Sequence, residues 1–160
     1  MEMSFTHVPP GEGRSLWVLG ELVTCKTTSE QTGGAYSLFE VTTQPGGRVL
    51  PHVQHREDEA FYVLEGEYEF LIEGHTIRAS ASYLLYVPKG TLHTHKNVGE
   101  RVGRMLISQT PGGLYERFFE EVGQTVDEVA GTLFLEDQLH VGRIVKVAAE
   151  YGIEIPLPIT

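Results

Sequence analysis

The chain has 160 residues, a net charge of −10 with neutral histidines, and a hydrophobic fraction of 41%. This length suits one domain with its own core, so we expect residues 1–160 to form a single domain. The negative charge argues against nucleic acid and anionic membrane surfaces as partners. The lone cysteine, Cys25, excludes an internal disulfide and a thiolate metal site. The first residues lack a signal-peptide pattern and no apolar run has membrane-spanning length, so we expect a cytoplasmic location.

Short β-prone runs follow one another from about residue 15 to about residue 110. They are LWVLGELVTC, AYSLFEVTT, EAFYVLEGEYEFLIEG, YLLYVP and GRMLIS, separated by turn clusters such as QTGG, QPGG, PKG and NVGE. Within YEFLIE, Tyr68, Phe70 and Ile72 alternate with residues that are mostly glutamate, which predicts a strand with one buried face. So many short strands predict an all-β sandwich or barrel.

Residues 112–155 have a helical pattern instead. In GLYERFFEEVG, Leu114, Phe118 and Val122 lie about one turn apart, and Gly123 stands where a helix ends. In EDQLHVGRIVKVAAEYG the same spacing joins Leu139, Ile144, Val147, Ala148 and Tyr151. We therefore expect two C-terminal α-helices packed on the outside of the β-structure or at its mouth.

Four of the seven histidines, His52, His55, His93 and His95, lie in two strand-like segments that a barrel could bring together. Glu59 follows the first pair closely. Imidazole and carboxylate ligands together suit a divalent transition metal, and these residue types do not distinguish Fe, Ni, Mn, Co, Cu and Zn.

The residue that stands beside His52 depends on strand parity. Side chains two apart on a strand share a face, so Gln54 should point the same way as His52, and His55 should point outward. His55 could bind the metal only if a β-bulge inserted one residue between the two histidines. We therefore predict Gln54 at this position and keep His55 as the alternative, although an amide oxygen is a weaker donor than imidazole.

Two gapped patterns resemble the motifs of the cupin superfamily. The first is Gly46, five residues, His52, one residue, Gln54, four residues, Glu59, six residues and Gly66, with Gln54 where the family has a histidine. The second is Ser82, five residues, Pro88, one residue, Gly90, two residues, His93, three residues and Asn97, with Ser82 where the family has a glycine. The resemblance implies a double-stranded β-helix, the cupin jelly-roll barrel, over about residues 15–110.

Longer stretches, such as PHV…HREDEAFYVLEGE, are similar to single-domain cupins of the quercetin dioxygenase-like group. That resemblance implies a metal held by His52, Glu59 and His93, a homodimer, and cleavage of a flavonol or related enolic aromatic with O₂. In such enzymes the metal-ligand glutamate can take the substrate proton, so Glu59 would also be the catalytic base.

The sequence leaves the substrate pocket and the reaction open. His95 shares the parity of His93, and aromatic side chains such as Tyr36 and Phe61 could line a pocket for a flat ligand. Two alternatives to the dioxygenase are a cupin that binds a small molecule without catalysis, and an isomerase or cyclase that uses Glu59 and His95 without O₂.

Overall fold

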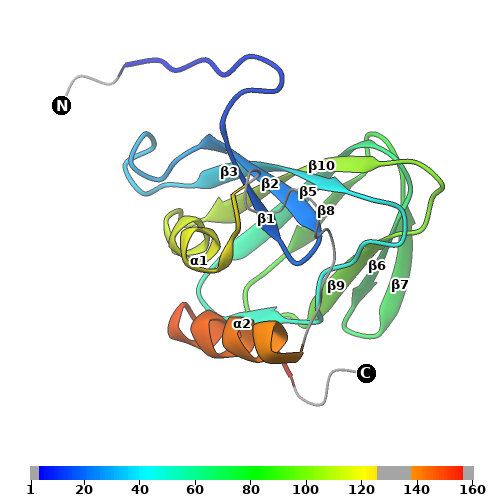
Figure 1. Ribbon diagram of the computed structural model, residues 1–160. Coiled ribbons are helices and arrows are strands. Elements are labelled where there is room, and N and C mark those ends of the chain that lie inside the picture. Colours follow the sequence, from blue (N-terminus) through cyan, green and yellow to red (C-terminus); the bar gives the residue numbers. More distant parts are fainter. Residues whose placement is uncertain (1–3, 126–137, 157–160) are drawn as a thin grey trace.

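The computed structural model describes residues 4–125 and 138–156. Its largest sheet has six antiparallel strands. Their spatial order is β1 (Arg14–Val18), β2 (Glu21–Thr27), β3 (Ser37–Thr43), β10 (Gly103–Thr110), β5 (Asp58–Glu65) and β8 (Leu84–Val87). A three-stranded sheet in the order β7 (His75–Ala79), β6 (Tyr68–Ile72) and β9 (His93–Asn97) lies across from it (Figure 1). This arrangement confirms the all-β cupin jelly-roll barrel.

Alternation of side chains explains how these strands enclose a core. On β3, Ser37, Phe39, Val41 and Thr43 are buried, and the residues between them are only half-buried. On β6, Tyr68 and Phe70 are fully buried while Leu71 is 45% exposed, as the period of two predicts. The inward faces of both sheets therefore form one apolar interior, into which a few polar side chains also project.

Two motif positions have backbone conformations that explain the family's preference for glycine. Gly66 has a φ of 89°, and a Cβ there would lie 2.7 Å from the Cα of Gly103. Ser82 has a φ of 74°, in the left-handed region that non-glycine residues seldom adopt. Both residues lie in tight turns, so the second motif keeps its turn geometry although a serine replaces the glycine.

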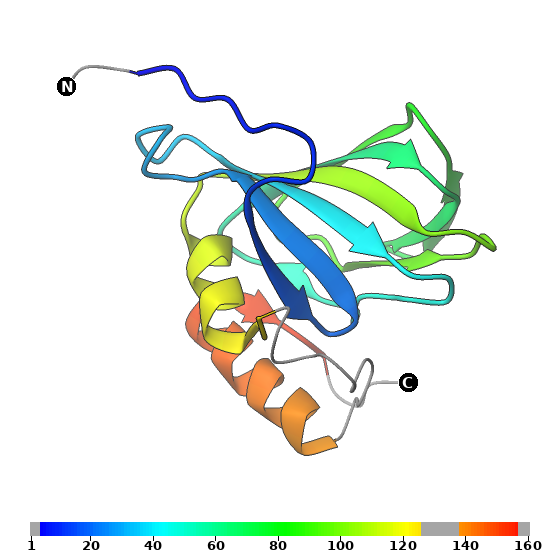
Figure 2. The ribbon, with the colours of Figure 1, turned by 45° about the horizontal axis from the view of Figure 1, so that its top comes forward.

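The helical extension also forms. Helix α1 (Leu114–Val122) ends at Gly123, whose N–H donates to the carbonyl of Phe119, and α2 (Gln138–Glu150) is followed by a short strand, β11 (Ile153–Glu154). β11 pairs with β4 (Val53–Gln54). Figures 1 and 2 show α1 and α2 side by side at the end of the barrel away from the β6–β7 hairpin. We call α1, α2 and β11 together the C-terminal cap.

The buried faces of the two helices differ slightly from the sequence prediction. On α1 the buried residues are Tyr115, Phe118 and Val122, and Leu114 is only half-buried, so Tyr115 takes the place predicted for Leu114. On α2, Ile144, Val147 and Ala148 are buried as predicted, and the side chain of Leu139 lies outside the described part of the chain. Among the described residues, no helix has the length and apolarity needed to span a membrane.

Candidate metal centre

Backbone pairing brings the two motif histidines together. The N–H of His52 donates to the carbonyl of His93 at 3.0 Å, and the N–H of His93 donates back to the carbonyl of His52 at 3.0 Å. Such a doubly bonded antiparallel pair puts both side chains on the same face. The two imidazole ring centroids are 4.4 Å apart, and both side chains are buried.

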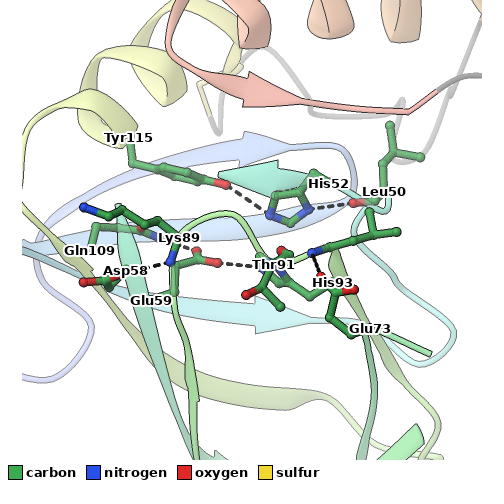
Figure 3. A network of polar contacts seen from close by, with 11 residues as sticks. Leu50, His52, Asp58, Glu59, Glu73, Lys89, Thr91, His93, Gln109 and Tyr115 are labelled. Carbon is green, nitrogen blue, oxygen red and sulfur yellow. Dashed lines mark hydrogen bonds and ion pairs between the residues drawn. The ribbon is translucent and has the colours of Figure 1, made fainter. Parts of the chain in front are cut away.

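Each imidazole is oriented by its own backbone. His52 Nδ1–H donates to the carbonyl of Leu50 at 2.8 Å, and His93 Nδ1–H donates to the carbonyl of Thr91 at 2.9 Å. Both Nε2 atoms are therefore directed toward the interior. His93 Nε2 lies 2.6 Å from Oε2 of Glu59, and the Tyr115 hydroxyl donates a long 3.4 Å hydrogen bond to His52 Nε2 (Figure 3).

Glu59 completes a compact buried group of possible ligands. It lies on β5 directly opposite Gln109 of β10, whose amide Nε2 donates to Oε1 of Glu59. One donor atom from each of His52, Glu59 and His93 lies within 4.8 Å of the others. Bonds of about 2 Å to one ion hold donor atoms no more than about 4 Å apart, so a small inward shift of these side chains would let a single metal ion bind all three.

The electrostatics of the group favour two ionised partners and one neutral imidazole. Burial raises the pKa of Glu59, but its hydrogen bond to His93 and the charges nearby outweigh burial and lower that pKa below the ordinary value. Burial lowers the pKa of His93, but the hydrogen bond and charge of Glu59 raise it overall. Burial and the neighbouring His93 lower the pKa of His52 to about 4, so His52 is neutral near pH 7 and its Nε2 is unprotonated.

Gln54 lies where strand parity predicts. Its side chain is 2% exposed, as buried as that of His52, and its amide interacts with the Tyr115 hydroxyl without forming a hydrogen bond of good geometry to any described residue. His55 points outward instead, and its Nε2 lies 2.8 Å from the Glu154 carboxylate at the surface. The alternative in which a bulge turns His55 inward is therefore wrong.

Several further polar atoms near this group have no partner. Both carboxylate oxygens of Glu57 and Oε1 of Gln109 are buried without a hydrogen bond from any described residue. Burial, with the nearby charge of Glu59, raises the pKa of Glu57 to about 7. A buried polar atom without a partner lowers the stability of the fold by about 1–3 kcal/mol. A polar ligand that formed hydrogen bonds to these atoms would recover part of that cost.

These residues fit a divalent transition metal. Two imidazoles and a carboxylate form the donor set, and burial shields it from water. The proton that His93 shares with Glu59 would have to leave when a metal binds, because only the deprotonated nitrogen is a ligand. The His52, Glu59 and His93 group could thus hold an ion whose identity its ligands leave open.

An apolar cavity adjoins the group, with a volume of about 80 Å³. Its walls come from the barrel and from all three elements of the C-terminal cap, as the lining residues Tyr115, Phe118, Ile144 and Ile153 show. The polar side chains that line it include His52, Glu59, Gln109, His95 and Glu21. The cavity is smaller than the roughly 150 Å³ cavity known to hold benzene.

Two of the three predicted pocket residues line the cavity, and the third does not. His95 and Phe61 are buried and line the cavity. Tyr36 does not line it, because it precedes the buried Ser37 and alternation turns it outward, where it is 41% exposed. The prediction of Tyr36 as a pocket residue is therefore wrong.

Sequence reasoning missed three polar residues of the site, namely Glu21, Gln109 and Tyr115. Glu21 begins β2 and Gln109 lies near the end of β10, each with the parity of the buried residues on its strand. A polar residue at an inward-facing strand position was the feature of the sequence that could have identified Glu21 and Gln109. Tyr115 gives no comparable signal, because an aromatic residue on the buried face of a helix usually belongs to the core.

Known proteins resemble this chain in sequence over part of its length and in fold over more of it. The Cupin domain family matches residues 39–108, from β3 into β10. Polyketide synthase CurC from Streptomyces cyaneus is 32% identical over 68 residues, which are 42% of this chain and 44% of that protein. This chain therefore spans less than half the length of that curated relative.

Solved structures show the same fold at low sequence identity. KdgF from Halomonas sp. has a TM-score of 0.62 and 20% identity, over 69% of this chain and 96% of that one. The polyketide cyclase RemF from Streptomyces resistomycificus has a TM-score of 0.60 and 18% identity, over 67% of this chain and 80% of that one. Residues 39–108 therefore match the Cupin domain family, and the described chain shares the jelly-roll fold of these solved structures.

Proposed function

We propose that this protein is a metal-dependent cupin oxidoreductase that binds an enolic or catecholic small molecule and promotes its reaction with O₂, as quercetin dioxygenase-like cupins do. The observation that carries the proposal is the buried His52, Glu59 and His93 group, with donor atoms within 4.8 Å of one another. It opens onto an apolar cavity, the environment expected around the ring of such a ligand. A bound transition ion would supply Lewis acidity toward a ligand oxygen and, if redox-active, a path for electrons to O₂.

The residues of the chain have distinct roles in this proposal. Glu59 is the general base: its lowered pKa keeps it ionised, and it can accept the proton of the ligand hydroxyl. Gln109 holds the other oxygen of Glu59 and so fixes the carboxylate. Burial raises the pKa of Tyr115 well above its ordinary value, so its hydroxyl stays protonated and can donate a hydrogen bond to a ligand oxygen beside His52.

The size of the cavity restricts the substrate class. A cavity of about 80 Å³ is smaller than one known to hold benzene, so even a ligand with one substituted ring would have to displace part of the cavity lining. A flavonol has three rings, so its binding would require the C-terminal cap to move away from the barrel. We therefore place small monocyclic enolones and catechols ahead of flavonols as substrates.

Oxygen consumption tests the proposed function. Protein loaded separately with Fe²⁺, Ni²⁺, Mn²⁺, Co²⁺ or Cu²⁺ should consume O₂ with a flavonol or a monocyclic enolone. A chelator should abolish the consumption, and Glu59→Gln should reduce it at least about a hundredfold, because it removes both a ligand and the base. Glu154→Gln, a matched change at an exposed carboxylate, should have no effect. Full activity in Glu59→Gln would rule out the proposed role of this residue.

A second candidate is an O₂-independent cyclase or isomerase. It is favoured by the partial sequence match to the polyketide synthase CurC and by a second buried histidine–glutamate pair, His95 and Glu21, in the same cavity. Product formed from the same substrates under anaerobic conditions would support this candidate. Ligand-induced protection in a thermal melt without turnover, in air or without it, would instead indicate a small-molecule-binding cupin.

A further inference from the structure

The cavity contains a second buried pair of titratable side chains that the proposed metal centre does not use. His95 on β9 and Glu21 at the start of β2 are 3% and 6% exposed, and both line the cavity. Nε2 of His95 lies 3.0 Å from Oε2 of Glu21. The two residues are 74 positions apart in the sequence, so only the closed barrel brings them together.

A chain of hydroxyl groups ends on the same carboxylate oxygen. Tyr68 donates to Oγ1 of Thr43 at 3.1 Å, and Thr43 donates to Oε2 of Glu21 at 2.6 Å. The side chains of Tyr68, Thr43, Glu21 and His95 are all buried. Oε2 of Glu21 therefore receives hydrogen bonds from two sides, which fixes the position of the carboxylate.

The second oxygen of the Glu21 carboxylate is a hydrogen-bond acceptor. No described residue donates to the other carboxylate oxygen, Oε1 of Glu21. Nε2 of His95 carries the hydrogen that it donates to Glu21. Nδ1 of His95 is buried and has no partner among the described residues. A ligand group that binds Oε1 of Glu21 must supply a hydrogen, because a carboxylate oxygen accepts and does not donate.

The pair lies one strand repeat away from the metal group. His93 and His95 occupy alternate positions on β9 with the same inward direction, so their Cα atoms are roughly 7 Å apart. The ring of Phe61 is close to both histidines: its centroid is 5.9 Å from that of His93 and 6.0 Å from that of His95. A single six-membered ring with polar groups at both ends spans a comparable distance.

We propose that Glu21 and His95 form a second polar subsite of the cavity, which accepts a hydrogen bond from a hydroxyl group at the end of the ligand away from the metal. The preferred ligand is then an enolic ring whose chelating oxygens face His52, Glu59 and His93 and whose separate hydroxyl faces Glu21. This inference rests on the proposed function in one respect, namely that the ligand is anchored at the metal group.

Two probes that differ in one hydroxyl group test the subsite. Kojic acid and allomaltol share the same hydroxypyranone chelating group, but kojic acid carries a hydroxymethyl group where allomaltol carries a methyl group. Calorimetric titration of the zinc-loaded protein without O₂ measures both dissociation constants independently of turnover. The wild-type protein should bind kojic acid about tenfold more tightly than allomaltol, the factor expected for one hydrogen bond to a charged acceptor.

Conservative variants assign the preference to the subsite. Glu21→Gln and His95→Phe should each bring the ratio of the two dissociation constants close to one while leaving the affinity for allomaltol within about threefold of wild type. Allomaltol binding thus reports that each variant is folded and holds its metal. Glu154→Gln and His55→Phe change the exposed histidine–glutamate pair in the same way and should keep the full preference.

The outcomes separate the subsite from the metal centre. Equal binding of the two probes by the wild-type protein, or a preference that survives both Glu21→Gln and His95→Phe, would overturn the subsite while the metal centre stands. If neither probe binds the zinc-loaded protein, the metal anchor of the proposed function fails and the subsite fails with it. A lack of O₂ consumption would contradict the proposed reaction alone, because the titrations are anaerobic.

Discussion

Gln54 occupies the position of a histidine in the first cupin motif and is buried beside Tyr115, with no hydrogen bond of good geometry to any described residue. A neutral amide oxygen is a weaker ligand for a late transition metal than an imidazole nitrogen. The structure places the side chain on the same buried face as His52, so a histidine there would be directed toward the same interior.

We predict that Gln54→His binds its metal at least about tenfold more tightly than the wild-type protein. Removing a group that only supports a metal ligand typically costs about 10–100-fold in metal affinity, and a change of the ligand itself should have at least that effect. Competition with a chelator, followed by elemental analysis, measures the change. His55→Ala is the matched control and should leave metal content unchanged. Unchanged or weaker binding in Gln54→His would contradict the placement of residue 54 at the metal.

Glu57 is a buried carboxylate without a hydrogen bond from any described residue, and its pKa is raised from 4.5 to about 7. Between these two pH values the folded state binds more protons than the unfolded state, so the contribution of Glu57 to stability falls as the pH rises. Above about pH 7 the cost of the buried charge is fully present.

Glu57→Gln should therefore stabilise the metal-free protein at pH 8, by about 1–3 kcal/mol, and change it little near pH 4.5. Urea unfolding of the variant and the wild type at both pH values gives the difference. The same substitution at exposed Glu154 should show no such dependence on pH. An equal effect at both pH values would mean that Glu57 is not the titrating group.

At the scale of secondary-structure elements, α1 couples the C-terminal cap to the barrel. Its inward face carries Phe118, which is 6% exposed and has aromatic neighbours in Tyr115, Phe119 and Tyr151. The same face holds the Tyr115 hydroxyl beside His52. The contacts that pack α1 on the barrel therefore also position the Tyr115 hydroxyl beside His52.

Phe118→Ala should lower the free energy of unfolding by about 3–5 kcal/mol, because it leaves a cavity between helix and barrel. Chemical denaturation measures the loss. On the outer face of the same helix, Glu120→Ala removes only an exposed ion pair with Arg14 and should cost less than about 1 kcal/mol. Equal costs for the two variants would mean that the helix does not dock through Phe118.

At the scale of the whole molecule, β8 forms one edge of the six-stranded sheet and exposes large apolar side chains. Leu84 and Tyr86 on this strand are 66% and 63% exposed, and Tyr62 on the neighbouring strand is 39% exposed. An exposed edge with apolar side chains favours pairing with another chain. We propose this edge as the contact surface of the homodimer predicted from the resemblance to cupins.

Tyr86→Lys should shift the protein from dimer to monomer, because a buried lysine at the edge would oppose pairing. Sedimentation equilibrium over a range of protein concentrations measures the shift. Lys89→Tyr in the neighbouring turn should leave the oligomeric state unchanged. A wild-type protein that sediments as a monomer throughout would contradict the proposed interface.

Local patterns predicted much of the fold and part of the site. The alternation in β6 and the parity of His52 and Gln54 are properties of neighbouring residues, so they can be read from the sequence. The same rule, applied to Ser37, would have turned Tyr36 outward. The pocket prediction failed there because it considered aromatic character and not strand direction.

The sequence by itself determined the alternating strands, the two helices and the shared face of His52 and Gln54. Those features follow from side-chain periods of 2 and 3.6 residues, which act over a few neighbouring positions. Only the tertiary structure decided that Tyr115 contacts His52 and that Glu21 contacts His95. The first pair is separated by 63 positions in the sequence and the second pair by 74. Their geometry depends on how the barrel closes and how the cap packs on it, which no local period encodes.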